Sequence, residues 1–388
     1  MGRETAPCVV AVAGDPGGAE ALAPVLERLL GDGRVRPALF PYREAIRLWE
    51  ARGLRAAPLT GALSRDAARD LLAREQAKAL VTGSSVNPDQ LERVFIAAAR
   101  DLGIPSLSIL DFWTNYRRRW ADPAGDLSDL PDIIAVMDDR ARAEMVAEGF
   151  PAERIEVTGQ PAFDRLPRMR AGFTRGRRDA VRKGLGLAPG EAFVLFASQP
   201  VSSLSGESAE NPLFPGYTER SVIPAVIRAL DRIGHAEGRK IACVLRPHPR
   251  EKAGDLRRWK GEHIRVLVQE GGDRLETAMA ADLVTGMTSV LLLEACYLGT
   301  PVVSIQPSPR LPDPLPSNRD GLSRAVYSEG EIEPVLQEML CRRGVREEYR
   351  KRLRSASPGG DATARVVQLI TGMLEGSGRG GGSWSGSR

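Results

Sequence analysis

The segment at residues 281–305 restricts the possible fold of this chain more than any other stretch. It reads ADLVTGMTSVLLLEACYLGTPVVSI, so a short apolar run is followed by the turn 285–289 and then by an apolar segment of helix length, Val290–Leu298. Gly299 ends that segment, and the β-branched run 301–305 predicts a strand. We therefore predict a strand, a turn, a helix and a second strand, which is the repeating unit of a parallel α/β sheet.

The turn of this unit suits a nucleotide ligand. Backbone N–H groups at a helix N-terminus, together with the hydroxyls of Thr288 and Ser289, suit a phosphate or a sugar hydroxyl. Glu294 is the only charged residue of the predicted helix and lies between one and two turns from its start, so it could reach a ligand hydroxyl. The alternative is an ordinary unit of a parallel sheet with Glu294 on a solvated edge.

The same segment resembles the nucleotide-sugar site of GT-B-fold enzymes, in the group that contains UDP-N-acetylglucosamine 2-epimerase, lipid-A-disaccharide synthase and CDP-glycerol glycerophosphotransferase. Thr288 and Ser289 stand at the family's Ser-Gly-Gly turn, and Glu294 at its ribose-binding glutamate. Leu298-Gly299-Thr300-Pro301-Val302 matches the Leu-Gly-x-Pro-Val that follows. The resemblance implies an α/β fold of the GT-B class, with two Rossmann-like doubly wound domains and an interdomain cleft.

The length of 388 residues fits two domains. We predict an acceptor-binding Rossmann-like domain at 1–165, a basic linker at 166–188, a domain binding a nucleotide sugar at 189–358, a helix crossing back to the first domain at 359–375, and a disordered Gly/Ser-rich tail at 376–388.

The overall charge and the scarcity of metal-binding residues exclude some functions. A formal charge of +4, from 54 basic and 50 acidic residues, is too small to indicate nucleic-acid binding. The four cysteines are isolated and the three histidines form no metal-binding pattern, so we expect no bound metal and no cofactor beyond a nucleotide-sugar co-substrate. Without an 18-residue apolar run or a signal peptide, we expect a cytoplasmic protein, which could contact the inner face of the membrane through basic residues. The oligomeric state is left open.

The glycine-rich loop 14–18 follows the first predicted strand. Glycines there permit a close approach of a ligand to the backbone, and the absence of a G-x-G-x-x-G pattern disfavours a nicotinamide cofactor. The loop is similar to the first loop of lipid-A-disaccharide synthase. The Arg and Glu that the epimerases carry there are replaced by Pro16 and Gly18, which counts against epimerisation.

Residues 111–120 gather four aromatic residues and three arginines directly after a predicted strand. Aromatic faces and guanidinium groups suit a sugar ring or an anionic acceptor. The alternatives are a lid or interface with the aromatics in the core, or a patch for nucleic acid. We predict acceptor binding by Gly14, Gly17, Gly18, Ser84, Trp113, Asn115, Tyr116 and Arg117.

The predicted second domain carries the donor-binding candidates. The strand ending at 245 leads into Arg-Pro-His-Pro-Arg, in which an imidazole beside cations suits phosphate contact better than service as a base. His-Pro at this place is similar to the CDP-glycerol transferases, where it contacts the donor diphosphate. A structural histidine is the alternative. The predicted donor-binding residues are Ser198, Gln199, Arg246, His248, Gly286, Met287, Thr288, Ser289 and Glu294.

The resemblance implies a metal-independent, inverting glycosyltransferase of polysaccharide biosynthesis, which moves a sugar from a UDP-linked donor to a hydroxyl acceptor. Helix N-termini and cationic side chains would stabilise the leaving diphosphate. The candidate bases are Asp111, which is slightly favoured, and Asp15. The alternatives are an isomerase or hydrolase like the 2-epimerases, a CDP-alcohol phosphotransferase, and a GT-B protein that only binds nucleotide sugars.

Overall fold

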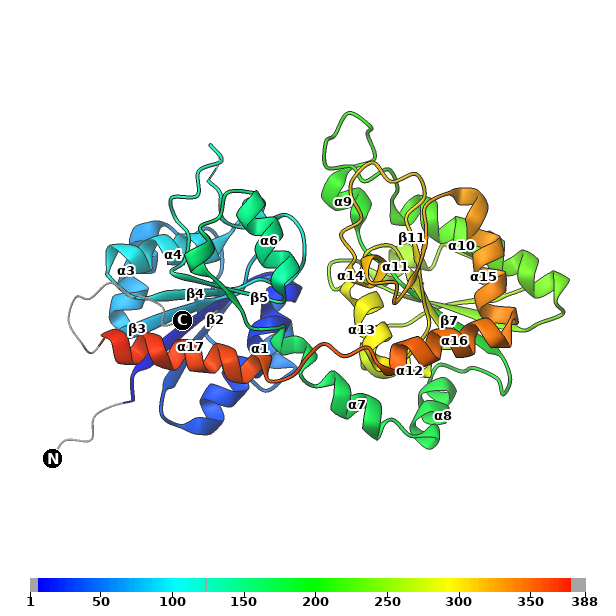
Figure 1. Ribbon diagram of the computed structural model, residues 1–388, viewed down its shortest axis with the longest axis horizontal. Helices are drawn as coiled ribbons and strands as arrows, with labels where there is room; N and C mark the ends of the chain where they lie inside the picture. Colours follow the sequence, from blue (N-terminus) through cyan, green and yellow to red (C-terminus); the bar gives the residue numbers. More distant parts are fainter. Residues whose placement is uncertain (1–5, 123, 378–388) are drawn as a thin grey trace. The chain divides into compact units, whose positions relative to one another are not determined.

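The structure is a computed structural model that describes residues 6–122 and 124–377. The chain forms two compact units, shown in Figure 1. The first unit contains Met1–Asp164 and Pro358–Arg388, and the second contains Arg165–Ser357. Each unit is built on one six-stranded sheet whose strands are all parallel, with helices in the connections. The two sheets establish the predicted α/β class with two Rossmann-like units.

The sheet of the first unit has the strand order β2-β1-β3-β4-β5-β6. The order reverses between β1 and β3, and ligands of such folds bind at the carboxyl ends of the strands at this switch point. The strands are short runs of apolar residues because helices cover both faces of a parallel sheet. They are β1 (Cys8–Ala13), β2 (Arg36–Pro41), β3 (Ala77–Thr82), β4 (Ser106–Ile109), β5 (Ile133–Val136) and β6 (Ile155–Val157).

The helices of the first unit include one from the C-terminal part of the chain. They are α1 (Pro16–Asp32), α2 (Glu44–Glu50), α3 (Arg65–Arg74), α4 (Leu91–Asp101), α5 (Tyr116–Trp120), α6 (Asp139–Ala147), the 3₁₀ turns η1 (Ala152–Arg154) and η2 (Pro161–Phe163), and α17 (Ala362–Ser377).

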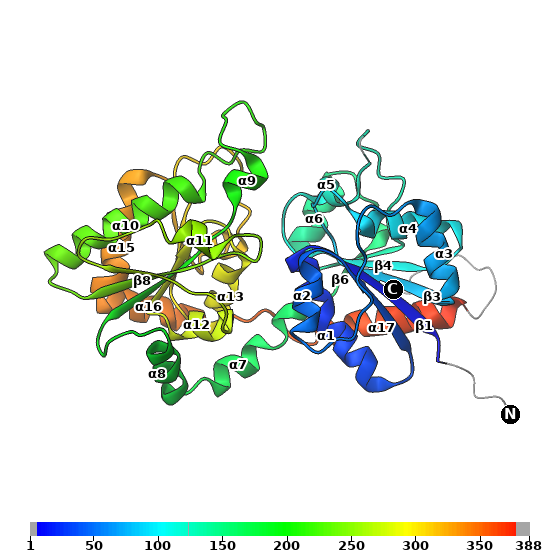
Figure 2. The same cartoon turned by 180° about the vertical axis from the view of Figure 1, so that it is seen from behind.

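Helix α17 completes the first unit. It packs against α1 and β3, and both views of the ribbon show it beside α1 (Figures 1 and 2). Val366 and Ile370 lie fully buried in the same apolar cluster as β1. Asp164 accepts hydrogen bonds from the backbone N–H groups of Ala362 at 3.1 Å and Thr363 at 2.7 Å, so a carboxylate nearly 200 residues away caps the helix. The part of the predicted tail from residue 378 onward lies outside the described residues.

The sheet of the second unit has the order β12-β11-β10-β7-β8-β9, so its switch point lies between β7 and β10. Thr218 begins α10 (Glu219–Ala236) through a capping box with Ser221. The strands are β7 (Ala192–Ala197), β8 (Ile241–Arg246), β9 (Arg265–Val268), β10 (Leu283–Gly286), β11 (Val302–Ile305) and β12 (Arg324–Val326). The helices are α7 (Leu166–Gly172), α8 (Arg175–Gly184), α9 (Val201–Ser205), α10 (Glu219–Ala236), α11 (Ala253–Leu256), α12 (Arg274–Ala280), α13 (Val290–Leu298), α14 (Pro316–Arg319), η3 (Glu329–Glu331), α15 (Ile332–Cys341) and α16 (Arg343–Arg354).

The predicted basic linker is helical in the structure. Most of residues 166–188 form α7 and α8, which belong to the second unit and contact α13 and α12. No residue of α8 is buried, so an apolar pattern could not indicate it. Its arginines instead pair with acidic residues of the unit, for example Arg177 with Glu276 at 2.8 Å and Arg178 with Asp282 at 2.7 Å.

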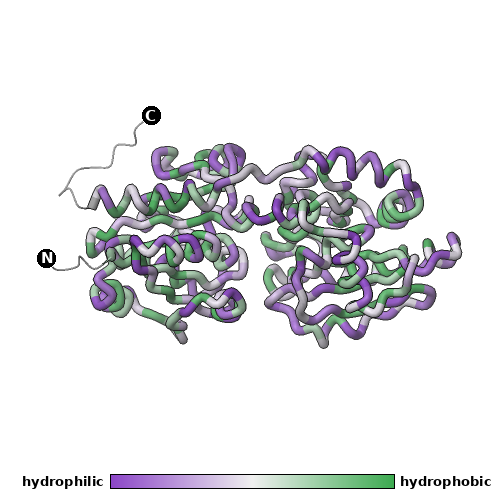
Figure 3. Tube along the Cα trace, turned by 90° about the horizontal axis from the view of Figure 1, so that it is seen from below, coloured by the Kyte–Doolittle hydropathy of each residue, from purple (hydrophilic) through white to green (hydrophobic). Residues whose placement is uncertain are grey.

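Apolar residues concentrate in the strands of both units, while the outer helices carry the polar residues (Figure 3). No helix in the described part of the chain combines the length and the apolar character needed to cross a bilayer.

Candidate functional site

The first unit gathers buried polar side chains at its switch point. Gly14 and Asp15 follow β1, Ser84 and Ser85 follow β3, and Asp111 follows β4. Asp15 and the two serines are at most 5% exposed. A polar cluster this deep must satisfy its own hydrogen bonds, which fixes the loops that carry it.

Glycines allow these loops to approach one another. A Cβ on Gly14 would lie 2.1 Å from the Tyr42 ring, and a Cβ on Gly17 would lie 1.8 Å from Oδ2 of Asp111. A Cβ on Gly18 would lie 3.0 Å from the backbone of the loop after β3. The protein itself therefore fills the space beside all three glycines. Their proposed role in acceptor binding stays a prediction, but the structure gives them a packing role.

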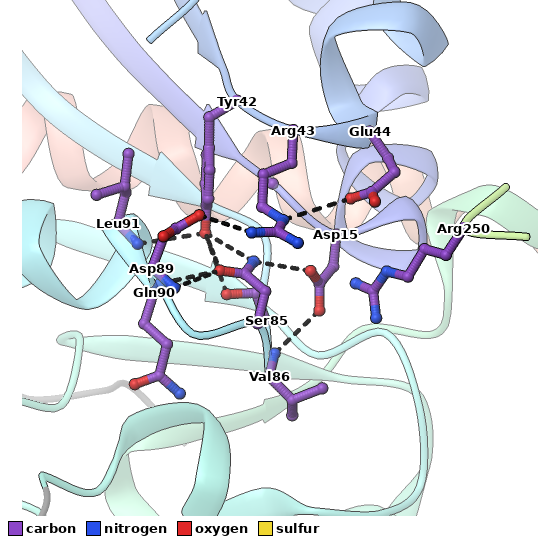
Figure 4. Close-up of polar contacts among 12 residues, drawn as sticks. Asp15, Tyr42, Arg43, Glu44, Ser85, Val86, Asp89, Gln90, Leu91 and Arg250 are labelled. Carbon is purple, nitrogen blue, oxygen red and sulfur yellow. Dashed lines mark hydrogen bonds and ion pairs between the residues drawn. The ribbon is translucent and has the colours of Figure 1, made fainter. Parts of the chain in front are cut away.

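Glu92, in the first turn of α4, is the centre of this cluster. Its Oε1 accepts from the backbone N–H of Gly14 at 2.9 Å, and its Oε2 accepts from the Tyr42 hydroxyl and from Ser85 Oγ, the latter at 2.8 Å. The polar contacts around Tyr42 are drawn in Figure 4. Burial of Glu92 raises its pKa to about 7, although these hydrogen bonds act in the opposite direction. Burial also raises the pKa of Tyr42, and the Glu92 carboxyl adds to that effect.

Asp15 joins the loop after β1 to the loop after β3. Its carboxylate accepts from the Val86 N–H at 3.0 Å and from Asn87 Nδ2 at 2.7 Å (Figure 4). Asn87 Nδ2 also donates to the Tyr42 oxygen at 3.0 Å. A chain of hydrogen bonds thus runs from Asp15 through Asn87 and Tyr42 to Glu92. Asp15 is a candidate base with a firmly fixed carboxylate.

Asp111 is held by a buried arginine. Its Oδ1 accepts from Arg119 Nη1 and from Ser84 Oγ, the latter at 3.1 Å, while Arg119 also donates to Ser84 Oγ at 2.9 Å. The side chains of Arg119 and Asp111 are only 5% and 12% exposed. This arrangement keeps a carboxylate in one orientation at the end of β4, as a general base requires.

The aromatic residues of 111–120 do not form an exposed platform. Trp113 and Tyr116 are 4% and 2% exposed, and their polar atoms donate to Asp138 at 2.8 Å and to Glu144 at 2.6 Å. These rings therefore lie in the core of the first unit, in agreement with the alternative of core aromatics. Asn115 precedes α5 with φ of 59°, and Arg117 donates to the Glu148 carbonyl at 2.7 Å.

In the second unit, two loops meet at the switch point. Gln199, after β7, accepts through Oε1 from Thr288 N at 2.9 Å and from Thr288 Oγ1 at 3.3 Å. Ser289 caps α13 by accepting from the Leu291 N–H. Of the predicted donor-binding residues here, Met287 is fully buried and Gly286 packs against Ala197 of β7. Gly286 and Met287 can therefore contribute only backbone groups to this loop.

The loop after β8 carries His248 and is fixed by Glu251. The Glu251 carboxylate accepts from Ser198 Oγ at 2.8 Å and from the His248 N–H at 2.7 Å. The backbone N–H of Arg250 donates to His248 Nδ1 at 3.2 Å, so a neutral His248 carries its proton on Nε2. Burial raises the pKa of Glu251. Ser198 and the backbone of His248 thus share Glu251 as a partner, and their role in donor binding stays a prediction.

Two guanidinium groups lie near each other at the same edge of the sheet. Arg246 donates to the carbonyls of Gly271 at 3.0 Å and Gly272 at 2.9 Å. Burial lowers the pKa of Arg246, and the positive charge of Arg274 lowers it further. Arg274 Nη1 donates to both carboxylate oxygens of Glu294, at 3.0 and 2.9 Å, and Glu294 is 1% exposed. Glu294 is therefore a buried partner of Arg274, and its contact with a ribose stays a prediction.

The sequence interpretation missed Glu92, Tyr42, Arg274 and the role of Glu251. Glu92 stands in the first turn of a helix, where acidic residues are common, so nothing in the sequence distinguished it. Arg274 could be recognised only once α12 was known to pack against α13.

Within the described residues, no group of three or more His, Cys, Asp or Glu side chains is placed to hold a metal ion. The predicted independence of a metal stays a prediction.

The fold is similar to known enzymes, although the sequence is not. No family model and no curated protein matches the chain. UDP-N-acetylglucosamine 2-epimerase of Neisseria meningitidis, solved with UDP-N-acetylglucosamine bound, is 14% identical over 94% of this chain and 100% of its own, with a TM-score of 0.66. The corresponding epimerase of Methanocaldococcus jannaschii is 13% identical over 94% and 99%, with a TM-score of 0.64. MurG of Acinetobacter baumannii is 14% identical over 94% and 99%, with a TM-score of 0.58.

Proposed function

We propose that the protein is an enzyme that acts on a UDP-linked N-acetylhexosamine. Its fold is of the GT-B class, its six-stranded parallel sheets carry polar clusters at both switch points, and the solved structures of similar fold include UDP-N-acetylglucosamine 2-epimerases and MurG. The second unit would bind the nucleotide diphosphate, and the first unit would supply the groups that move protons. The loops after β7 and β10 carry this proposal, because they meet at the switch point of the second unit, where Gln199 accepts from the Thr288 N–H and Ser289 caps α13. The N-terminus of α13 at this place favours an anionic group such as a diphosphate.

Epimerisation at carbon 2 of the sugar is the reaction that we favour. It needs acid and base groups near the sugar but no acceptor, and Asp15 and Asp111 are fixed carboxylates at the switch point of the first unit. The aromatic residues expected to bind an acceptor lie in the core instead. Two of the structures with this fold are 2-epimerases, which supports the same choice.

Glycosyl transfer to a hydroxyl acceptor is the second candidate. The loop 14–18 lacks the Arg and Glu of the epimerases, because Pro16 and Gly18 stand at their places. A transferase also needs only one base, and Asp111 with its Arg119 partner would meet that need.

The two reactions can be separated by incubating the protein with UDP-N-acetylglucosamine in D₂O. Epimerisation removes the proton from carbon 2 and returns a deuteron, so proton NMR should show the loss of the C2 proton signal and the appearance of the epimer. Release of free UDP with an unchanged C2 proton signal would instead support the second candidate, with water taking the place of the hydroxyl acceptor of the sugar. The same experiment is repeated with GDP-, CDP- and dTDP-sugars. If the protein neither binds UDP nor converts any of these sugars, both candidate functions are refuted.

The role of Asp111 is tested in the same assay. Asp111→Asn should lower turnover by roughly 10²- to 10⁴-fold, because it removes a base, while the dissociation constant for UDP stays nearly unchanged. Arg257 and Glu270 form an exposed ion pair in the second unit, so Glu270→Gln is a control that should change neither quantity. Full turnover in Asp111→Asn would remove Asp111 from the mechanism.

A further inference from the structure

The second unit has a pocket at the edge of its sheet opposite the candidate site. The pocket has a volume of about 190 Å³, and its lining includes Ala281, which precedes β10, and Pro301, which precedes β11. The pocket therefore lies at the amino ends of these strands, whereas Thr288 and Ser289 follow the carboxyl end of β10. Helix α13 runs between the two edges, since it begins after Ser289 and ends before Gly299.

Three arginines from three helices line this pocket, and none of its lining residues is acidic. Arg170 comes from α7, Arg178 from α8 and Arg350 from α16. In Figures 1 and 2, α8 lies on the same side of the unit as α12 and α16. Three guanidiniums around one hollow form a strongly positive lining, and arginine forks are matched to the oxygens of a phosphate or a carboxylate.

Arg170 lines the pocket and is fixed through one nitrogen of its guanidinium group. Its Nη1 donates to the carbonyls of Tyr297 at 3.2 Å and Leu353 at 2.9 Å, at the ends of α13 and α16. A Cβ on Gly299 would lie 3.4 Å from Cζ, Nε and Nη2 of Arg170 alike, so the glycine packs against the face of this guanidinium. Within the described residues, the hydrogen bonds of Arg170 use Nη1 alone, so its Nε and Nη2 edge remains available to an oxyanion, which it can bind with two parallel hydrogen bonds.

A purely structural role explains only part of this charge. Arg170 satisfies helix carbonyls, and Arg178 shares the Asp282 carboxylate with Arg182, at 2.7 and 3.3 Å. Within the described residues, however, the structure gives Arg350 no hydrogen bond or close ion pair. Burial lowers the pKa of Arg346, one turn away, and the charges of Arg239 and Arg350 lower it further. Arg350 therefore contributes to the pocket lining a cation that forms no ion pair within the described residues.

We propose that this pocket binds a phosphate group. Its volume exceeds that of several waters at roughly 30 Å³ each, so a phosphate and part of its hydration shell fit within it. Arg350 lines the pocket and is exposed, so the phosphate could belong to a soluble phosphomonoester or to a lipid headgroup. The proposal does not depend on the reaction proposed above, because the two sites lie at opposite edges of the sheet.

Calorimetric titration of the whole protein with inorganic phosphate tests this site directly. Arg350→Gln should raise the dissociation constant roughly tenfold, because it removes a charge-assisted contact. Arg178→Gln should have a similar effect on phosphate binding. Asp282 still has Arg182 as its partner in that variant, so the substitution does not leave an unpaired carboxylate. Arg354→Gln is the matched control, since Arg354 is exposed on the same helix but does not line the pocket. It should leave the binding of phosphate unchanged.

Sedimentation with vesicles separates the two sources of the phosphate. Phosphatidic acid carries a phosphomonoester, whereas phosphatidylglycerol carries a phosphodiester and similar surface charge. Binding to phosphatidic acid vesicles that Arg350→Gln abolishes and Arg354→Gln retains would identify a lipid headgroup. Binding to inorganic phosphate without vesicle binding would identify a soluble ligand. The proposal is overturned if neither probe binds, or if Arg354→Gln weakens binding as much as Arg350→Gln does, since general surface charge would then explain the result.

Discussion

The carboxylate of Asp111 occupies the space that a side chain on Gly17 would need, since a Cβ there would lie 1.8 Å from Oδ2. Gly17→Ala should therefore displace Asp111 from Arg119 and lower turnover by more than tenfold, the effect expected when a catalytic group moves by about 1 Å. Gly31→Ala, near the end of the same helix, is the matched control because its Cβ would meet nothing within 4 Å. It should stabilise the protein by about 0.5–1 kcal/mol, as Ala does in a helix. Equal turnover in the two variants would contradict the importance of this contact.

The stability of the protein should depend on the ionisation of Glu92. Its pKa is raised by burial from 4.5 in the unfolded chain to about 7 in the folded protein. Between these values the folded state holds a proton that the unfolded state releases, so stability falls as the pH rises from about 4.5 to 7, by at most about 1.4 kcal/mol per pH unit. Glu92→Gln should remove this slope. Urea denaturation of the parent protein and of Glu92→Gln at several pH values measures the free energy of unfolding. If this free energy depends on pH in the same way in both proteins, Glu92 does not cause the pH dependence.

Glu294 and Arg274 should act as one unit in nucleotide binding. Glu294→Gln removes the carboxylate that orients Arg274, so the dissociation constant for UDP should rise roughly tenfold. If Glu294 acts through Arg274, Arg274→Met alone and the double variant should bind UDP equally weakly. A further loss in the double variant would indicate a separate contact of Glu294 with the ribose. The exposed pair of Arg257 and Glu270 again provides the control.

The cap that Asp164 places on α17 should contribute to the stability of the first unit. Asp164→Ala removes the acceptor of two backbone N–H groups and should lower the free energy of unfolding by about 1–2 kcal/mol. Asp66 is 88% exposed in the first turn of α3, so Asp66→Ala should cost less than about 0.5 kcal/mol. Thermal melts followed by circular dichroism compare the two, and an equal loss would show that the cap contributes nothing.

Much of the fold could be predicted from the sequence, because buried parallel strands are continuous apolar runs. The predicted unit at 281–305 appears as β10, α13 and β11, with Gly299 in the left-handed conformation at φ of 87°. The short strand β6 was not predicted, since three residues carry too little pattern. Helix α8 was missed for a different reason, because it buries no apolar residue and its arginines pair with acidic residues about 100 positions away.

The candidate site could be predicted only in part. Loops at strand ends were recognisable, and Ser198 with His248, and Thr288 with Gln199, do come together there. What the loops contact was not recognisable, because it depends on tertiary packing. The glycines of 14–18 show this well, since the sequence suggests space for a ligand and the structure fills that space with Tyr42 and Asp111.

The position of α17 also determines when the first unit can be completed during synthesis. The second unit is continuous in the chain, so a ribosome delivers all of it before residues 362–377 emerge. The β1 sheet meanwhile lacks the helix that contributes Val366 and Ile370 to its core. Domains generally fold as units, so the first unit cannot be completed until α17 is available. A polypeptide released early, anywhere inside the second unit, would thus leave its amino-terminal half with an open apolar surface for chaperones and proteases to recognise.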